Sequence, residues 1–254
     1  MTLIVKQRLL IAISVIAGIA MLLAPMIPQN PGYHDFADQR AWLGIPNAFN
    51  VLSSLVFAWV GIDGLYRLSA QKSLRIRAGI YPAYLVFFAA LVLTALGSAY
   101  YHWSPDNPSL ALDRLPMAIA FMSFTAILLA ERVSLGFARR AFPLLMVAAI
   151  AGVVYWYYSE LAGRGDLRGY LLLQLTPILL LPVILLAFES RYTRSADLWW
   201  LLAWYLAAKL CELLDQAIYD AFGMVSGHSL KHIAAGIGSL VFLRHLRLRE
   251  TAPR

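Results

Sequence analysis

The sequence is poor in charge and in cysteine, and it has no segment with the composition of a soluble domain. Only 14% of its 254 residues are charged, whereas a soluble domain carries about 25%. The single cysteine, Cys211, excludes an internal disulfide. The Asn-Pro steps at Asn30 and Asn107 provide no glycosylation acceptor. What the chain does have is 61% hydrophobic residues and a mean hydropathy of +0.67, which indicates a polytopic membrane protein.

Eight apolar stretches are long enough to cross about 30 Å of hydrocarbon at 1.5 Å per residue. We predict helices over residues 8–27, 46–66, 80–102, 113–131, 140–158, 169–188, 197–217 and 228–246. The expected fold is all-α, a transmembrane helix bundle with a seven-helix core and one extra N-terminal helix.

The first predicted helix resembles a signal peptide, because Lys6 and Arg8 precede its apolar run. Ala24-Pro25 is a poor cleavage site, however, and the run is long, so we favour a retained helix that acts as a signal anchor. The predicted organisation is an N-terminal helix in residues 1–30, a hydrolase core in 31–247 and a basic tail in 248–254.

The order of crossings brings distant polar residues to one side of the membrane. We call the side where the third predicted helix ends, at His102, face A. The fourth helix begins on face A with Asp113, and the eighth begins there with His228 and His232. The segment before the second helix, 28–46, lies on the same face. The polar residues of these segments are therefore expected at one depth.

The basic residues gather on the opposite side, face B. The face A segments contain Arg40, Arg164 and Arg168, with Arg114 at a helix start. Face B receives fifteen: Lys6, Arg8, Arg67, Lys72, Arg75, Arg77, Arg132, Arg139, Arg140, Arg191, Arg194, Arg244, Arg247, Arg249 and Arg254. The positive-inside rule places face B and both termini in the cytoplasm, and the polar cluster on the periplasmic, extracellular or lumenal side. The net charge of +7 thus reflects topology, and we expect no nucleic-acid partner.

Three of the five histidines lie at the predicted depth of the polar cluster. His228 and His232 are four residues apart and share one face of a helix, and His102 ends another helix on the same side. Three imidazoles with an open fourth position are typical of a hydrolytic zinc centre, in which the pKa of a bound water falls to about 7. We therefore predict a zinc site at His102, His228 and His232.

Two more residues each have a structural and a catalytic interpretation. Asp113 begins a predicted helix, where it is an N-cap carboxylate, a residue that acts in catalysis or supports the metal ligands, or both. Ser98 lies one turn before His102. It either bonds back to the carbonyl of the residue four before it, or donates a hydrogen bond to an oxyanion or to the zinc-bound water.

Together these residues resemble the alkaline ceramidase family, within a superfamily that includes adiponectin-type receptors and Per1-like proteins. The resemblance rests on Ser98-x3-His102, Asp113 and His228-x3-His232, together with the run Asn47-Ala48-Phe49-Asn50-Val51-Leu52-Ser53-Ser54. It covers about residues 33–247. It implies that the histidines bind zinc, that Asp113 orients water and moves its proton, and that Ser98 stabilises the oxyanion. The implied reaction is hydrolysis of a ceramide-like lipid amide to a fatty acid and a sphingoid-type amine.

A calcium site is a further implication of the resemblance. Animal members of the family bind calcium in an acidic loop, with a glutamate where this chain has Asn47. Asp35, Asp38 and Asn47 are the corresponding candidates, but Arg40 adds positive charge, and fewer anionic oxygens bind calcium more weakly. A solvated acidic loop is the alternative.

Charged and aromatic residues elsewhere leave alternatives open. Lys209, Glu212 and Asp215 are either ion-paired or part of a transport pathway, and we favour a structural Lys209–Glu212 pair. The aromatic runs Tyr155–Tyr158 and Trp199, Trp200, Trp204 are typical of membrane interfaces.

Two other functions fit the same fold. An adiponectin-type receptor would place its zinc side in the cytoplasm, against the charge distribution, whereas a lipid-remodelling esterase needs the same zinc and carboxylate. The expected partners are a membrane lipid and the bilayer, and the oligomeric state is open.

Overall fold

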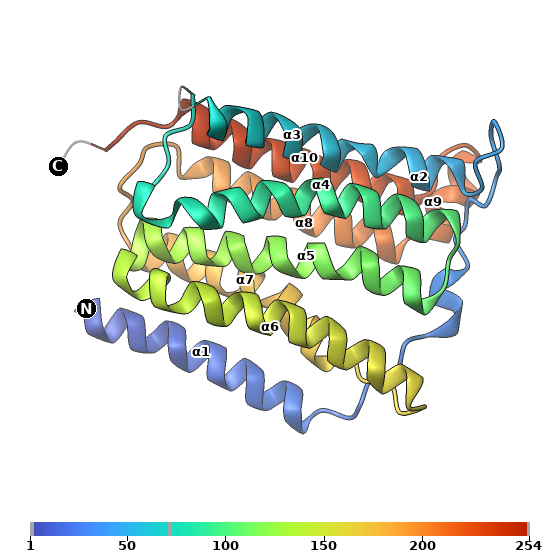
Figure 1. The fold of residues 1–254 in the computed structure, drawn as a ribbon, viewed down its shortest axis with the longest axis horizontal. Coiled ribbons are helices and arrows are strands. Elements are labelled where there is room, and N and C mark those ends of the chain that lie inside the picture. The colour runs from blue at the N-terminus through green and yellow to red at the C-terminus, as the bar shows by residue number, and fades with distance from the viewer. Residues whose placement is uncertain (1–2, 71–72, 253–254) are drawn as a thin grey trace.

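The computed structural model describes residues 3–70 and 73–252, which form a bundle of helices running along one long axis (Figure 1). Lys72 and Arg254, counted above on face B, lie outside these residues. The long helices are α1 Leu3–Leu23, α3 Leu55–Ser69, α4 Tyr81–Trp103, α5 Asn107–Leu128, α6 Leu135–Leu161, α7 Arg168–Ala187, α8 Ala196–Leu213 and α10 Gly227–Leu248. The short ones are η1 Pro31–His34, α2 Ala48–Ser53, η2 Ala78–Ile80, η3 Leu129–Val133 and α9 Asp215–Phe222. The described residues form no strand, so the all-α prediction is confirmed.

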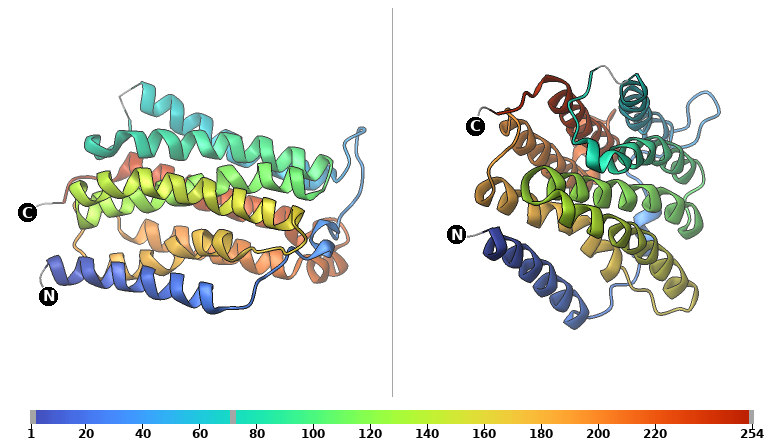
Figure 2. Two further views of the ribbon diagram at one scale, coloured as in Figure 1. Left: turned by 60° about the horizontal axis from the view of Figure 1, so that its bottom comes forward. Right: turned by 60° about the vertical axis from the view of Figure 1, so that its left-hand side comes forward.

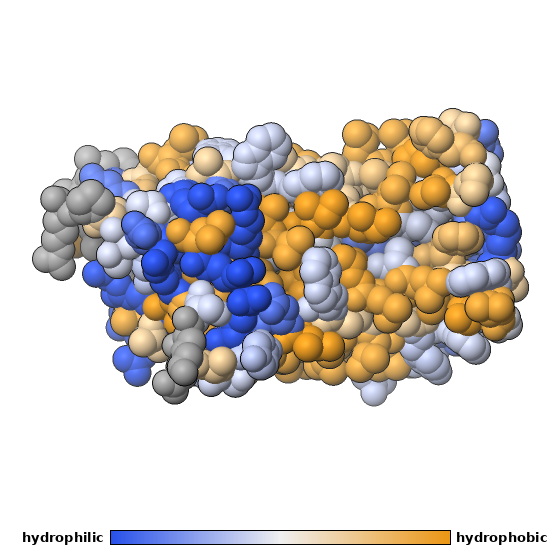
Figure 3. Space-filling view, turned by 90° about the horizontal axis from the view of Figure 1, so that it is seen from above, coloured by the Kyte–Doolittle hydropathy of each residue, from blue (hydrophilic) through white to orange (hydrophobic). Residues whose placement is uncertain are grey.

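Six segments of the bundle are long and apolar enough to span a membrane. They are Ile4–Leu23, Ala48–Ser69, Ala78–Trp103, Asn107–Val133, Leu135–Leu161 and Arg168–Ala187. The other two expected spans, α8 and α10, run alongside them but carry charged residues and the histidine pair. Figure 3 shows the resulting surface, with hydrophobic residues over the middle of the bundle and a large hydrophilic patch toward one end. The protein is a helical membrane bundle.

The predicted start of the fourth helix at residue 113 is wrong. The helix α5 begins at Asn107, because Asp106 caps it: its carboxylate accepts a hydrogen bond from Ser109 N at 2.7 Å, and Ser109 Oγ accepts from Asp106 N at 3.1 Å. Pro108 fits the first turn, where its missing N–H costs nothing. Asp113 therefore lies inside α5, nearly two turns from its start, and is not a helix cap.

The helices α4 and α5 approach closely at Gly97. A Cβ atom at this position would lie 2.4 Å from the carbonyl oxygen of Leu112 and 3.1 Å from Asp113 Cα. The absence of a side chain at Gly97 lets the backbone of Asp113 pack directly beside the turn of α4 that carries Ser98 and His102.

The extra helix α1 lies on the outside of the bundle, against α7 (Figure 2). Arg168, at the start of α7, donates to the carbonyl of Ala24 just beyond α1 at 2.7 Å. Both chain termini lie at the same end of the bundle, and α4 ends, and α2 and α10 begin, at the opposite end (Figure 1). The tail predicted at 248–254 is packed as far as it is described, since Thr193 N donates to the Glu250 carbonyl at 2.8 Å.

Candidate metal centre and active site

The three predicted zinc ligands converge at the end of the bundle away from the termini. One ligand atom from each of His102, His228 and His232 lies within 4.8 Å of the others. The ring centroids form a nearly equilateral triangle with sides of 4.8, 5.0 and 5.1 Å. All three residues are buried. Helices that begin and end at this end of the bundle thus bring together histidines separated by up to 130 residues in sequence.

The nitrogen atoms of this cluster fit a metal. His102 Nε2 and His232 Nε2 are 3.4 Å apart, and ligand atoms on a tetrahedral zinc with bonds of about 2.0–2.1 Å stand about 3.3–3.4 Å apart. His228 Nε2 is buried without a hydrogen-bond partner among the described residues. A buried polar atom without a partner is costly, and a metal ion supplies one. The donor set is suited to zinc.

The short helix α2 holds the ligands in place. Ser53 Oγ bonds His232 Nδ1 at 2.9 Å, which leaves Nε2 free for the metal position. Asn47 Nδ2 donates to the carbonyl of His102 at 2.8 Å. Such contacts to the outer side of a ligand fix its orientation. The run Asn47–Ser54, noted in the sequence through a family resemblance alone, is therefore the brace of the histidine cluster.

A second brace fixes the start of α10. His228 N donates to Asp215 Oδ1 at 2.7 Å, and Asp215 Oδ2 accepts from Ala37 N at 3.1 Å. Phe36, next to Ala37, is 4% exposed and its ring lies 4.7 Å from the His102 ring and 4.8 Å from the His228 ring. The loop before α2 thus covers the cluster with an aromatic ring. Sequence reasoning missed Phe36, because the spacing of a loop residue gives no sign of what it covers.

Asp113 and Ser98 lie together beside the cluster. Both are buried, and both line the same cavity as His232. Ser54 Oγ donates to Ser98 Oγ at 3.0 Å. Asp113 Oδ1 has no partner among the described residues. The N-cap alternative for Asp113 is excluded, because Asp106 occupies that position.

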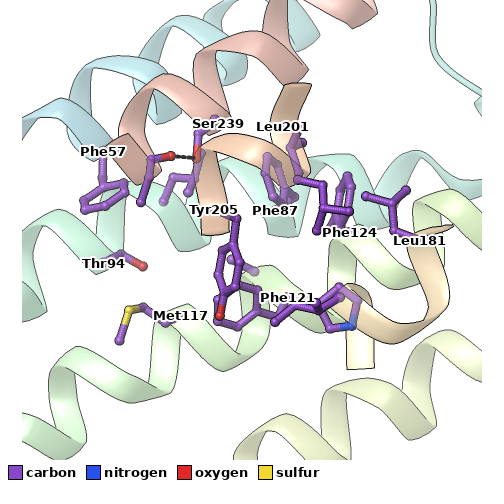
Figure 4. Close-up of a pocket in the computed structure, with 17 residues that line it drawn as sticks. Phe57, Phe87, Thr94, Met117, Phe121, Phe124, Leu181, Leu201, Tyr205 and Ser239 are labelled. Carbon is purple, nitrogen blue, oxygen red and sulfur yellow. Dashed lines mark hydrogen bonds between the residues drawn. The ribbon is translucent and has the colours of Figure 1, made fainter. Parts of the chain in front are cut away.

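A cavity of about 360 Å³ connects these residues to the interior of the bundle. Ser98, Asp113 and His232 line it. It adjoins an apolar pocket of about 140 Å³ deeper in the bundle, shown in Figure 4, and the two share lining residues. The shared residues are Phe57, Thr94, Met117, Phe121, Tyr205 and Ala235. An apolar chain could lie in the deeper pocket with its polar end at the histidine cluster.

The comparison with protein-family models decides the family. The model described as Ceramidase matches residues 44–252, which include every residue of the histidine cluster and its braces in α2. The chain belongs to the ceramidase family. The resemblance seen in the sequence is thereby confirmed. Comparisons with curated proteins and with solved structures each returned no match.

Membership in the ceramidase family supports a membrane ceramide hydrolase and implies amidohydrolase chemistry on a lipid substrate. The match begins beyond α1, in keeping with a helix added to the family core.

Two of the three residues predicted to bind calcium, Asp38 and Asn47, are engaged by other protein groups. Arg40 binds both carboxylate oxygens of Asp38 at 2.8 Å, and the amide of Asn47 is engaged with His102. Burial opposes ionisation of Asp38, but the hydrogen bonds from Arg40 outweigh it and lower the pKa of Asp38. Asp35 is exposed. A calcium ion here stays a prediction, and the Asp38–Arg40 pair counts against it.

The predicted Lys209–Glu212 pair is present, with 2.8 Å between its charged atoms. Lys231, which sequence reasoning did not single out, binds the same carboxylate at 2.8 Å. Tyr33 donates to Glu212 at 3.0 Å, and burial raises the pKa of Tyr33, which keeps its hydroxyl protonated. The predicted helix over 197–217 is interrupted: α8 ends at Leu213, just after Glu212, and α9 begins at Asp215. This interruption lies beside the start of α10, where Asp215 accepts from His228 N, whereas a transport site predicts a broken helix at the membrane midplane.

Proposed function

We propose that this chain is a zinc-dependent amidohydrolase that cleaves the amide bond of ceramide-like lipids to a fatty acid and a sphingoid-type amine. The observation that carries the proposal is a cluster of three buried imidazoles, one of which, His232, lines the same cavity as a buried carboxylate and a serine. That cavity leads into an apolar pocket. The family match supports the lipid substrate.

His102, His228 and His232 would hold the zinc ion. A zinc ion supplies a Lewis acid and makes hydroxide available near neutral pH. Ser53 and Asn47 keep two of the imidazoles oriented, through His232 Nδ1 and the His102 carbonyl respectively. Phe36 covers His102 and His228 and excludes solvent from that side.

Asp113 is the proton carrier in the proposal. In the hydrolysis, the oxygen of water bonds to the acyl carbon, the C–N bond breaks, and a proton passes to the amine nitrogen. The partner-free Oδ1 of Asp113 can take the proton of the attacking water and return it to the leaving nitrogen. Ser98, which lines the same cavity, donates a hydrogen bond to the carbonyl oxygen as negative charge develops there.

The apolar pocket binds the fatty acyl chain. Its wall consists mainly of aromatic and aliphatic residues, among them Phe87, Phe124, Leu181 and Leu201 (Figure 4). The pocket shares Met117 and Phe121 with the cavity, so an acyl chain bound there would have its polar end near Asp113.

Product analysis by mass spectrometry tests the reaction. Purified protein incubated with a mixture of lipid amides and lipid esters of equal chain length should release fatty acid and free amine from the amides. Release from esters alone would replace the proposal with a lipid-remodelling esterase. If neither amides nor esters were hydrolysed although metal was bound, an adiponectin-type receptor function would be favoured instead.

The active site is proposed to face away from the cytoplasm, with both termini on the cytoplasmic side. The basic residues near the terminal end of the bundle support this orientation. A cysteine introduced at Asn107, in a variant lacking Cys211, should react with an impermeant thiol reagent added to intact cells. Protection of that cysteine until lysis would reverse the orientation.

A further inference from the structure

Arg114 is a buried cation that forms no ion pair with any residue the structure describes. Its exposure is 5%, and its Nη1 atom is buried with no hydrogen-bond partner among the described residues. By contrast, Arg249, Arg168 and Arg40 each bind a buried carboxylate: Glu131, Asp166 and Asp38 respectively. An ionisable side chain left unpaired inside a membrane segment usually serves function rather than stability.

Aromatic rings hold the guanidinium group from three sides without neutralising it. Its central carbon lies 4.2 Å from the ring of Trp156 in α6, 4.8 Å from Tyr170 in α7 and 5.4 Å from Tyr33 in η1. Trp156 is fully buried, so its assignment to a membrane-interface belt is wrong. Ring faces attract a cation but offer no acceptor for its N–H groups. The cage fixes the plane of the guanidinium and leaves its donors available.

The described residues that line the cavity include more positively charged side chains than negatively charged ones, and no carboxylate pairs with Arg114. Glu212 is engaged by both Lys209 and Lys231. Asp113 is close enough to Arg114 for electrostatic interaction, but the two form no ion pair within 4.0 Å. The same Asp113 is assigned to proton transfer. Among the described residues that line the cavity, Arg114 is thus the cation whose counter-ion is absent.

The position of Arg114 separates it from the acyl pocket. It lines the cavity but not the deeper apolar pocket. The polar residues Gln29, Asn30 and Gln174 also line the cavity and are absent from the lining of the apolar pocket. If the acyl chain occupies the apolar pocket and the amide lies at Ser98 and Asp113, the part of the cavity near Arg114 receives the amine half of the substrate.

We propose that Arg114 binds an oxyanion on the amine half of the substrate, so that this enzyme prefers acidic lipid amides. Such a substrate joins a fatty acyl chain through an amide to an amine that carries a carboxylate or a phosphate. A planar guanidinium donates two parallel hydrogen bonds to either group. The inference rests on the proposed amidohydrolase function and adds its substrate class.

The test compares substrates with the same acyl chain: N-oleoylglycine, N-oleoyl-phosphoethanolamine and neutral N-oleoylethanolamine. The wild type should show a higher kcat/KM on at least one acidic amide than on the neutral one. Arg114→Gln should lower the ratio of acidic to neutral kcat/KM by about 10- to 100-fold, the effect of losing charge-assisted hydrogen bonds. Arg114→Lys, which keeps the charge but not the fork, should give an intermediate ratio. The carboxylate and phosphate arms show which oxyanion is bound.

Arg164→Gln is the matched control, because Arg164 is exposed in the loop after α6 and the same charge is removed. Its ratio should equal that of the wild type. A wild-type preference for the neutral amide, or an equal loss on all three substrates in Arg114→Gln, would overturn the proposal. The second result would make Arg114 structural, or a binder of the fatty acid product that all three substrates share.

A binding measurement separates this proposal from the proposed function. In the Asp113→Asn background, which turns over slowly, N-oleoylglycine or N-oleoyl-phosphoethanolamine should raise the melting temperature more than N-oleoylethanolamine does. Adding Arg114→Gln should remove that difference. The difference would stand even if the wild type hydrolysed none of the three. Equal shifts for all three lipids would reject the oxyanion site, whatever the enzyme hydrolyses.

Discussion

Two buried polar clusters lie at opposite ends of this bundle, and they differ in how completely their atoms are paired. At the end near the termini, Arg249 is fully buried and donates to both oxygens of Glu131 and to the carbonyl of Arg75. Tyr84 donates to the same carboxylate, and the ring of Tyr192 lies 3.9 Å from the guanidinium. In this cluster, the Arg249 cluster, the charged groups are paired with one another. Among the described residues, its one buried atom without a hydrogen-bond partner is His245 Nδ1, which lies 3.5 Å from Asp197 Oδ2.

The histidine cluster at the other end is open. Among the described residues, buried atoms without partners include His102 Nδ1, Asp113 Oδ1, Arg114 Nη1, Tyr205 Oη and His228 Nε2. Each such atom costs about 1–3 kcal/mol. Unpaired atoms gathered beside a cavity are the pattern expected where a ligand or water completes them. The Arg249 cluster therefore stabilises the bundle, and the histidine cluster is built for ligands.

Paired histidine substitutions in α10 test this contrast with the largest expected effect. His228 and His245 are both buried in the same helix, one in each cluster. His228→Ala should abolish hydrolysis, because it removes a metal ligand. His245→Ala should lower the melting temperature yet keep the turnover of the folded fraction. Steady-state assays and thermal denaturation in detergent measure both. Equal loss of turnover in the two variants would remove the distinction between the clusters.

Asp113→Asn should lower kcat by about 10²–10⁴-fold, the usual contribution of a positioned proton carrier. Metal content should be unchanged. Asp106→Asn is the control, because asparagine caps a helix as well as aspartate does, and its kcat should match the wild type. Near-normal turnover in Asp113→Asn would move the proton carrier elsewhere. His34 and Asp35, in the loop before α2, would then be the candidates.

Ser98→Ala should lower kcat by about 10²–10³-fold with little change in stability, as expected for one donor to a developing oxyanion. Ser123, a buried serine ten residues further along α5 than Asp113, provides the control. Ser123→Ala should keep its activity. If both serine variants lost activity equally, Ser98 would have a packing role only.

Glu131→Gln should lower stability and leave turnover unchanged, whereas the preceding substitutions lower turnover. Breaking a buried ion pair costs about 3–5 kcal/mol, so the variant should melt at a lower temperature while its folded fraction keeps metal and turnover. Glu189→Gln, the same change at an exposed carboxylate near that end, should melt like the wild type. A catalytic defect in Glu131→Gln beyond its loss of folded protein would mean that the two clusters are coupled.

The histidine cluster could be predicted from sequence because it depends on two simple regularities. The i, i+4 spacing fixes His228 and His232 on one helix face, and the number of crossings fixes the end of the bundle where His102 meets them. The predicted start of this helix at Asp113 was wrong. Asp106-x-x-Ser109 is a capping signal that could have placed the start of α5 correctly.

The pairing of charges could not be predicted in the same way. Arg114 counts in the sequence as one more basic residue, and its isolation appears only when α6, α7 and η1 bring aromatic rings and no carboxylate to it. Lys231 is equally uninformative until the fold places it beside Glu212. Tertiary contacts decide which charges are paired, and spacing along one chain carries no information about them.

Metal analysis of purified variants tests most directly whether the histidine cluster is a metal centre. The wild type, purified without chelator, should contain about one zinc ion per chain, and His245→Ala should contain the same. His102→Ala and His228→Ala should each contain almost none, since a site with two remaining imidazoles binds zinc weakly. Undiminished zinc in His228→Ala, or a wild type that binds none when zinc is supplied, would contradict the account.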